Sequence, residues 1–303
     1  MSVSLLNRVS RKAAAALPAG LVQLAVRVRE VVAPQPWPWD EAAVRLHRME
    51  KRGRGPLPYP HYLYGLLSAA RAARALGAEA FTALEFGVAG GNGLRALEDH
   101  ANLIHDWYGT RVHVVGLDSG AGLLPASDPR DCGFALHSGA FAMDETALRA
   151  RLRHAELVLG DVTHTTAPLM QRIDSGDLPP LGFVAHDLDV YTGTHAALDA
   201  MTLLAPDRTL PRVPMYFDDL TGYPYTTETG ERAAITAFNA KHDTRRIGQV
   251  ENLEKTLGGS SRFATWPRHI FVLHTFNHPR YNTPEPITGL PDLSLRDNPR
   301  DWS

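Results

Sequence analysis

Two short acidic runs carry the side chains best suited to chemistry in this chain. They are His186-Asp187-Leu188-Asp189-Val190-Tyr191 and Phe217-Asp218-Asp219. Each follows an apolar run typical of a buried strand, and strands of an open α/β sheet end at a common ligand-binding edge. The gathered carboxylates repel one another unless a cation neutralises them or some stay protonated. Hard oxygen ligands suit Mg²⁺, so the runs indicate a divalent metal site or, alternatively, solvated helix caps without a metal.

A glycine-rich loop follows an earlier apolar run. It reads Glu85-Phe86-Gly87-Val88-Ala89-Gly90-Gly91-Asn92-Gly93. Glycine lets the backbone approach a ligand closely, and the start of the next helix offers free N–H groups. Ala89 and Asn92 stand where the dinucleotide fingerprint has glycine. The loop therefore indicates a cofactor site or, alternatively, a tight strand-to-helix turn without a ligand.

Two further aspartates follow the next expected strands. Asp118 ends the second strand, where a carboxylate can accept both hydroxyls of a ribose from a nicotinamide or an adenosyl cofactor. Asp161 follows Gly160 after the third strand, where it either accepts from an adenine amino group or caps the next helix. Both interpretations of Asp161 stay open at this point.

Alternating apolar runs and amphipathic stretches predict the elements that position these residues. From Tyr62 onward the pattern is typical of repeated βα units around a parallel sheet. Strands are expected at 82–87, 112–118, 156–159, 182–187, 213–218 and 269–276. Helices are expected at 62–76, 92–106, 144–154, 164–175, 194–204 and 229–241. The fold class is therefore α/β, with a doubly wound sheet.

Composition narrows the class of protein. The 303 residues are 44% hydrophobic and 21% charged, which suits a globular chain with a large core. A formal net charge of -2 provides no electrostatic attraction to nucleic acid, and no apolar run is long enough for a transmembrane segment. Cys132 is the single cysteine, so an intrachain disulfide and a thiolate metal cage are both excluded. A cytoplasmic location is expected.

The N-terminal residues differ from the rest in charge. Residues 1–60 are rich in Lys and Arg, and helical spacing of apolar residues within 21–28 predicts a helix. This segment is expected to be a basic helical extension or lid, ahead of a catalytic domain at 61–303. Attachment of the basic face to an anionic membrane surface is the alternative.

The order and spacing of these motifs resemble the macrocin O-methyltransferase family of class I S-adenosylmethionine-dependent methyltransferases. The resemblance spans about residues 80–245. It rests on Leu84-Glu85-Phe86-Gly87-Val88, Gly90-Gly91, Gly116-Leu117-Asp118-Ser119, Gly122-Leu123, Gly160-Asp161, Asp187-Leu188-Asp189-Val190-Tyr191-Thr192, Phe217-Asp218-Asp219 and Gly230-Glu231-Arg232-Ala233-Ala234-Ile235. The chain departs from the family at Ser119-Gly120-Ala121-Gly122, where an aromatic residue is usual.

The resemblance implies a Rossmann-like methyltransferase sheet of about seven mostly parallel strands, with helices on both faces. It implies S-adenosyl-L-methionine as cofactor, Mg²⁺, and O-methylation of a hydroxyl on a sugar or natural product. The implied metal ligands are Asp187, Asp218 and Asp219. The expected cofactor-binding residues are Glu85, Gly87, Ala89, Gly90, Gly91, Asp118, Ser119, Asp161 and Asp187.

Methyl transfer to oxygen requires a group that accepts the hydroxyl proton. The expected catalytic residues are Asp187, Asp189 and His278, and His278 is the first choice of base. A wall for the acceptor is expected among the aromatic residues Tyr223, Tyr225, Trp266 and Tyr281, although packing explains them equally well.

Two other classes of function are compatible with parts of the pattern. A nicotinamide-dependent oxidoreductase would use the glycine loop and Asp118, but it leaves the acidic runs without a role. A non-catalytic binding protein with a degenerate methyltransferase fold is the second alternative. The expected partner is a small hydroxylated acceptor rather than nucleic acid, and a homo-oligomer is possible.

Overall fold

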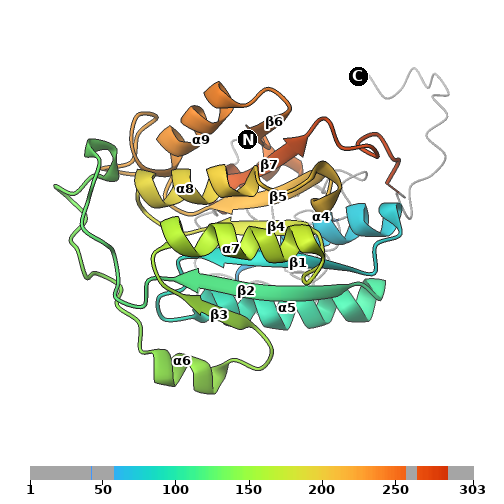
Figure 1. Cartoon of the computed structure of the whole chain (residues 1–303), viewed down its shortest axis with the longest axis horizontal. Helices are drawn as coiled ribbons and strands as arrows, with labels where there is room; N and C mark the ends of the chain where they lie inside the picture. Colours follow the sequence, from blue (N-terminus) through green and yellow to red (C-terminus); the bar gives the residue numbers. More distant parts are fainter. Residues whose placement is uncertain (1–41, 43–57, 257–264, 286–303) are drawn as a thin grey trace, which may run out of the picture.

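The computed structural model describes residues 42, 58–256 and 265–285 (Figure 1). A seven-stranded sheet with the order β3-β2-β1-β4-β5-β7-β6 forms its centre. The strands are β1 (Ala80–Phe86), β2 (Arg111–Asp118), β3 (Glu156–Leu159), β4 (Leu181–His186), β5 (Arg212–Phe217), β6 (Arg245–Gln249) and β7 (Ile270–Thr275). Neighbours from β3 to β5 pair in parallel, whereas β7 is antiparallel to both β5 and β6. The strand order reverses between β1 and β4, which confirms the predicted doubly wound α/β fold.

Helices cover both faces of the sheet (Figure 1). One face carries α4 (Pro60–Leu76) and α5 (Asn92–Tyr108), which contact each other and the central strands. The other carries α7 (Val162–Ser175), α8 (Tyr191–Met201) and α9 (Gly230–Lys241), packed in that order. The shorter helices are α6 (Glu145–Arg151), α10 (Leu253–Thr256) and the 3₁₀ turns Pro129–Asp131, Pro206–Arg208 and Trp266–His269. Among the described helices, none combines the length and apolarity needed to span a membrane.

The central strands β1 and β4 are buried along nearly their whole length because helices cover both of their faces. In β4 every residue is buried, and in β1 only the first is partly exposed. Gly65 lets α4 pack closely, since a Cβ there would lie 2.2 Å from the Phe183 ring. The six predicted strands and the six predicted helices are all present, with ends displaced by a few residues.

The edge strand β6 was missed by the sequence pattern. Its sequence, RRIGQ, has no apolar run, and only Arg245 and Ile247 are buried. The strand exists because it pairs with β7, and the guanidinium of Arg245 donates to the carbonyls of Met201 and Leu204. Long-range pairing rather than local pattern therefore defines this edge.

A long loop follows β2 at the end of the sheet where the parallel strands finish. Residues 119–144 form this loop, drawn in green at the left of Figure 1. Two of its segments are joined by backbone hydrogen bonds, from Leu123 N to Ala140 O at 2.8 Å and from Gly139 N to Leu123 O at 2.8 Å. The loop is thus tied to itself across the carboxyl end of the sheet.

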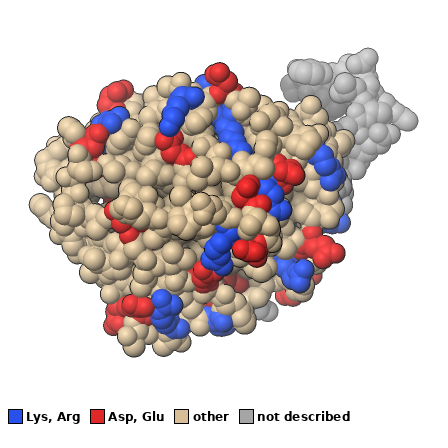
Figure 2. Space-filling model, viewed as in Figure 1, with Lys and Arg blue, Asp and Glu red and all other residues tan. Residues whose placement is uncertain are grey.

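The face seen in Figure 2 carries Lys and Arg interspersed with Asp and Glu rather than gathered by sign. The predicted basic extension at residues 1–60 lies outside the described residues, apart from residues 42 and 58–60. Its boundary with a domain at 61–303 stays a prediction.

Candidate active site

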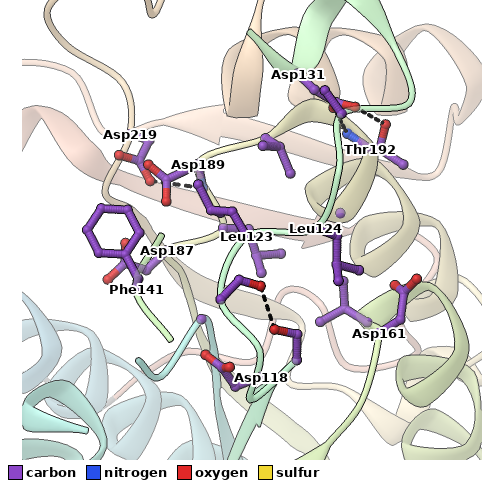
Figure 3. Close-up of a pocket in the computed structure, with 18 of the residues that line it drawn as sticks. Asp118, Leu123, Leu124, Asp131, Phe141, Asp161, Asp187, Asp189, Thr192 and Asp219 are labelled. Carbon is purple, nitrogen blue, oxygen red and sulfur yellow. Dashed lines mark hydrogen bonds between the residues drawn. The ribbon is translucent and has the colours of Figure 1, made fainter. Parts of the chain in front are cut away.

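A cavity of about 610 Å³ opens at the carboxyl end of the sheet, beside the point where the strand order reverses. Its walls come from the glycine-rich loop, the 119–144 loop, the start of α7 and the residues that follow β4 and β5. Figure 3 shows Asp118 and Asp161 toward one side and Asp187, Asp189 and Asp219 toward another. The predicted convergence of acidic residues on one edge is confirmed.

Asp118 ties the glycine-rich loop to the loop after β2. Its Oδ2 accepts the backbone N–H groups of Val88 at 2.8 Å and Ala89 at 2.9 Å, and its Oδ1 accepts that of Gly120 at 2.6 Å. A carboxylate offers about four acceptor positions, and three are used here. The geometry leaves about one for a ligand, so one ribose hydroxyl rather than two fits Asp118.

Asp161 and Ser119 line the same cavity while serving their own loops. Asp161 caps α7, since its Oδ1 accepts Thr163 N–H at 2.8 Å, so the capping interpretation is confirmed. Contact with an adenine amino group stays a prediction. The Ser119 hydroxyl donates to Gly122 O at 2.6 Å and accepts from Ala121 N–H at 3.1 Å. Both residues therefore shape the cavity wall whether or not a ligand touches them.

Glu85 lies behind the cavity wall rather than in it. The expected cofactor residues that line the cavity are Gly87, Ala89, Asp118, Ser119, Asp161 and Asp187, whereas Glu85, Gly90 and Gly91 do not line it. Oε1 of Glu85 accepts the Tyr62 hydroxyl at 2.8 Å, and its buried Oε2 has no partner. Burial, with a smaller contribution from the charge of Asp118, raises the pKa of Glu85 to about 8 despite the bond from Tyr62.

Three carboxylates meet at the ends of β4 and β5. One oxygen from each of Asp187, Asp218 and Asp219 lies within 4.8 Å of the others. Asp187 and Asp218 are exposed at the cavity surface and Asp219 is partly buried, with protein atoms crowded around all three. Burial, followed by the charges of Asp218 and Glu85, raises the pKa of Asp187 to about 8. Burial and the neighbouring aspartates likewise raise the pKa of Asp219 to about 8.

Hydrogen bonds hold this acidic cluster in place. The Tyr216 hydroxyl donates to Asp218, and the Tyr225 hydroxyl donates to Oδ1 of Asp189 at 2.6 Å. Asp189 N donates to Oδ2 of Asp219 at 3.1 Å, with Asp189 in the left-handed region at φ 62. A strained backbone at a non-glycine residue persists only where the surroundings fix it, and such residues gather at functional sites.

Glu231 supports the cluster from α9 and was not predicted as a site residue. It is completely buried, and its Oε2 accepts Asp219 N–H at 3.0 Å. Burial and the charge of Asp219 raise the pKa of Glu231 well above its ordinary value. The resemblance covered this helix but assigned it no role. Tyr216 was also missed, because it reads as an ordinary strand residue.

The prediction of His278 as the base is wrong. Because β7 runs antiparallel to β5, the residues after it lie at the opposite end of the sheet, where His274 pairs with Arg212. There His278 is buried, and its Nδ1 accepts Arg280 N–H at 2.9 Å. The catalytic roles of Asp187 and Asp189 stay predictions, and both residues line the cavity.

The predicted aromatic wall is also wrong in most of its members. Tyr281 lies at the opposite end, bonded to His274 at 2.7 Å, and Trp266 packs against His61 and Tyr64. Tyr223 is 86% exposed, and of the four only Tyr225 reaches the acidic cluster. The apolar wall is instead supplied by the 119–144 loop, through Leu123, Leu124, Pro125, Ala126 and Phe141.

Asp131 anchors that loop to α8. It is 2% exposed, and it accepts the N–H groups of Ser127 and Asp128 at 3.0 Å each. It also accepts the N–H of Thr192 at 2.7 Å and its hydroxyl at 2.8 Å (Figure 3). Nothing local in the sequence distinguishes Asp131 from an exposed loop aspartate, so only the folded arrangement reveals its role.

Comparison with known proteins gives only distant likeness. No protein-family model matches the chain, and no curated protein matches it. Among solved structures, the calicheamicin methyltransferase CalS11 is 22% identical over 68% of this chain and 86% of its own, with a TM-score of 0.45. The O-methyltransferase NovP is 16% identical over 64% and 77%, with a TM-score of 0.47. An O-methyltransferase from Bacillus cereus is 15% identical over 83% and 96%, with a TM-score of 0.38. Sequence identities and TM-scores this low identify neither the reaction nor the acceptor. Any proposal about either must therefore be argued from the geometry of the site.

Proposed function

We propose that this protein is an S-adenosylmethionine-dependent methyltransferase that methylates a hydroxyl oxygen of a small acceptor with the help of Mg²⁺. One observation carries the proposal. A single cavity joins a glycine-rich loop and Asp118 to a cluster of three carboxylates, and its described lining contains seven aspartates without a Lys or Arg.

The charge of the cavity favours a cationic cofactor over a dinucleotide. The pyrophosphate of a nicotinamide cofactor would bring two negative charges next to unpaired carboxylates, which costs free energy. S-adenosylmethionine carries a sulfonium and an ammonium group instead. The loop is also close to the cluster, because a Cβ at Gly87 would lie 1.7 Å from the Asp187 carbonyl oxygen. These features support the methyltransferase over the oxidoreductase.

The donor set of the acidic cluster fits a hard divalent cation. Asp187, Asp218 and Asp219 offer oxygen ligands only, and Mg²⁺ commonly takes a few carboxylates together with waters. The pKa values of Asp187 and Asp219 are raised by burial and, to a smaller extent, by repulsion from neighbouring carboxylates that a cation would relieve. When bound, Mg²⁺ would lower the pKa of a hydroxyl placed on it.

Residues of the chain then have separate roles. Asp118 and the glycine-rich loop bind the cofactor, and Asp189, held by Tyr225, accepts the hydroxyl proton. When bound, S-adenosylmethionine would supply an electrophilic methyl group to the acceptor oxygen, with its sulfur as the leaving group. The 119–144 loop lines the cavity and supplies its apolar wall, against which the acceptor would pack.

Calorimetric titration with S-adenosylmethionine and with NAD, each with and without Mg²⁺, tests this function. The wild-type protein is expected to bind S-adenosylmethionine and not NAD. Asp118→Ala should weaken that binding by more than about 10-fold, since a charge-assisted hydrogen bond and the anchor of the loop are lost. Asp243→Ala is the matched control, because Asp243 is exposed and precedes β6 at the other end of the sheet. Binding of NAD alone, or of neither cofactor, contradicts the proposal.

A further inference from the structure

Phe141 combines three properties that packing does not explain. Its side chain is 63% exposed, although it belongs to the lining of the cavity. Its backbone has a φ of 63°, in the left-handed region that a bulky residue avoids. An exposed phenylalanine in a strained conformation contributes little to the core, so its position calls for another explanation.

The surrounding loop fixes Phe141 in this position. The hydrogen bonds between Leu123 and both Gly139 and Ala140 tie the chain immediately before it, and Met143 N donates to Gly120 O at 3.2 Å immediately after it. Gly122 allows the close approach of the two segments, since a Cβ there would lie 2.3 Å from Ala140 O. The ring is therefore presented to the cavity by a braced segment.

Phe141 faces the part of the cavity where the acidic cluster lies. Figure 3 draws Phe141 on the same side of the view as Asp187, Asp189 and Asp219, and all four residues line the same cavity. A molecule that reaches the carboxylates therefore also meets an aromatic face without hydrogen-bonding groups. The site combines a group of carboxylates with an apolar wall. This combination suits a flat or cyclic ligand that carries hydroxyls on one edge.

We infer that Phe141 selects the acceptor by stacking on a six-membered ring whose two adjacent hydroxyls point at Asp187, Asp218 and Asp219. This inference rests on the proposed function and names the acceptor class of the same site. Adjacent hydroxyls fit the cluster because a divalent cation commonly binds two neighbouring ligand oxygens. A catechol ring and the apolar face of a pyranose with a vicinal diol share this chemistry, and the test below distinguishes them.

Two probes test the inference on protein loaded with S-adenosylhomocysteine and Mg²⁺. They are 2,3-dihydroxynaphthalene, an aromatic vicinal diol, and methyl α-mannopyranoside, a pyranose with a vicinal diol. Their dissociation constants are measured by calorimetry for the wild type, Phe141→Ala and Phe134→Ala. Phe134 is the matched control, because it lies in the same loop and is 65% exposed but does not line the cavity.

At least one probe is expected to bind the wild type, and Phe141→Ala should weaken that probe about 5- to 10-fold, as loss of a ring stack predicts. Phe134→Ala should leave it unchanged, and neither variant should change the affinity for S-adenosylhomocysteine. Whichever probe depends on Phe141 identifies the ring type. Normal cofactor binding with no diol binding, or with equal diol affinity in wild type and Phe141→Ala, overturns the inference alone. Absence of cofactor binding in the wild type overturns the proposed function as well.

Discussion

The two ends of the sheet handle charge in opposite ways. At the amino end, Glu285 lies between two arginines, with 2.9 Å from its Oε2 to Arg71 Nη2 and 2.7 Å from its Oε1 to Arg212 Nη2. At the carboxyl end, the acidic cluster forms no ion pair with any Lys or Arg of the described chain. Instead, the Tyr216 hydroxyl donates to Asp218, the Asp189 N–H donates to Asp219, and the Asp219 N–H donates to Glu231.

The charges at the amino end of the sheet stabilise the fold through ion pairs, whereas the unpaired charges at the carboxyl end are available to a ligand. A paired, partly exposed carboxylate contributes modestly to stability. Unpaired and crowded carboxylates destabilise the protein unless they are protonated or bind a cation, and they persist where they have a function. The comparison predicts that substitutions at the carboxyl end change ligand binding, whereas those at the amino end change only stability.

The largest effect is expected from Asp187→Asn. This substitution removes a metal ligand, and since loss of outer partners alone typically costs 10- to 100-fold, Mg²⁺ affinity should fall by more than about 100-fold. Calorimetric titration with Mg²⁺ in the presence of S-adenosylhomocysteine measures it. Asp243→Asn, at the other end of the sheet, should bind Mg²⁺ like the wild type. Equal Mg²⁺ affinities for the wild type, Asp187→Asn and Asp243→Asn would show that Mg²⁺ does not bind at this site.

Asp131→Asn should have the next largest effect, on stability. The substitution turns one acceptor oxygen into a donor and leaves buried N–H groups unpaired, so the free energy of unfolding should fall by about 2 kcal/mol. Urea denaturation gives this value. Asp106→Asn, an exposed residue of α5, should change it by less than about 0.5 kcal/mol. Similar losses in both variants would contradict the anchoring role.

Glu85→Gln should change how stability depends on pH. The folded protein holds the Glu85 proton up to a pKa of about 8, whereas the unfolded chain releases it near 4.5, so this group's contribution to stability falls as pH rises between those values. Gln keeps an acceptor for the Tyr62 hydroxyl and cannot titrate. The variant should therefore lose stability less steeply over this interval, as denaturation at several pH values without metal would show.

Glu98→Gln is the matched comparison for that measurement and should act with the opposite sign. Although burial raises the pKa of Glu98, three backbone N–H bonds from residues 153–155 outweigh burial and lower it. Its contribution is present above the unfolded pKa and is lost as pH falls. A steeper loss toward high pH in Glu85→Gln than in the wild type would contradict the assignment of a buried, protonated Glu85.

The smallest effect is expected from Glu285→Gln at the amino end. Its two ion pairs are partly exposed to solvent, so the free energy of unfolding should fall by about 1 kcal/mol or less. Affinities for S-adenosylmethionine and Mg²⁺ should be unchanged. A weakened cofactor affinity in this variant would show that the two ends are not separate in function.

The sequence predicts the residues at the carboxyl end of the sheet better than those at its amino end, for a physical reason. Asp118, Asp187 and Asp218 each follow a buried apolar run, and parallel strands bring such positions together by rule. His278 was misplaced because a strand pattern carries no direction, and the antiparallel course of β7 sends the residues after it to the other end.

The residues that complete the site depend on tertiary structure. Tyr216 reads as a strand residue, and Glu231 as the first turn of a helix, until packing brings them to the cluster. Phe141 and Asp131 lie in an irregular loop, where their exposure and burial follow from contacts with distant segments. Local pattern contains no signal for either of them.

A crystal structure of the protein with S-adenosylhomocysteine and Mn²⁺, in which Mn²⁺ replaces Mg²⁺ and is located by its anomalous scattering, tests the central claim most directly. The account predicts the ribose at Asp118 and one anomalous peak among Asp187, Asp218 and Asp219, in the same cavity. A nucleoside bound elsewhere, or Mn²⁺ bound away from these three carboxylates, would contradict it.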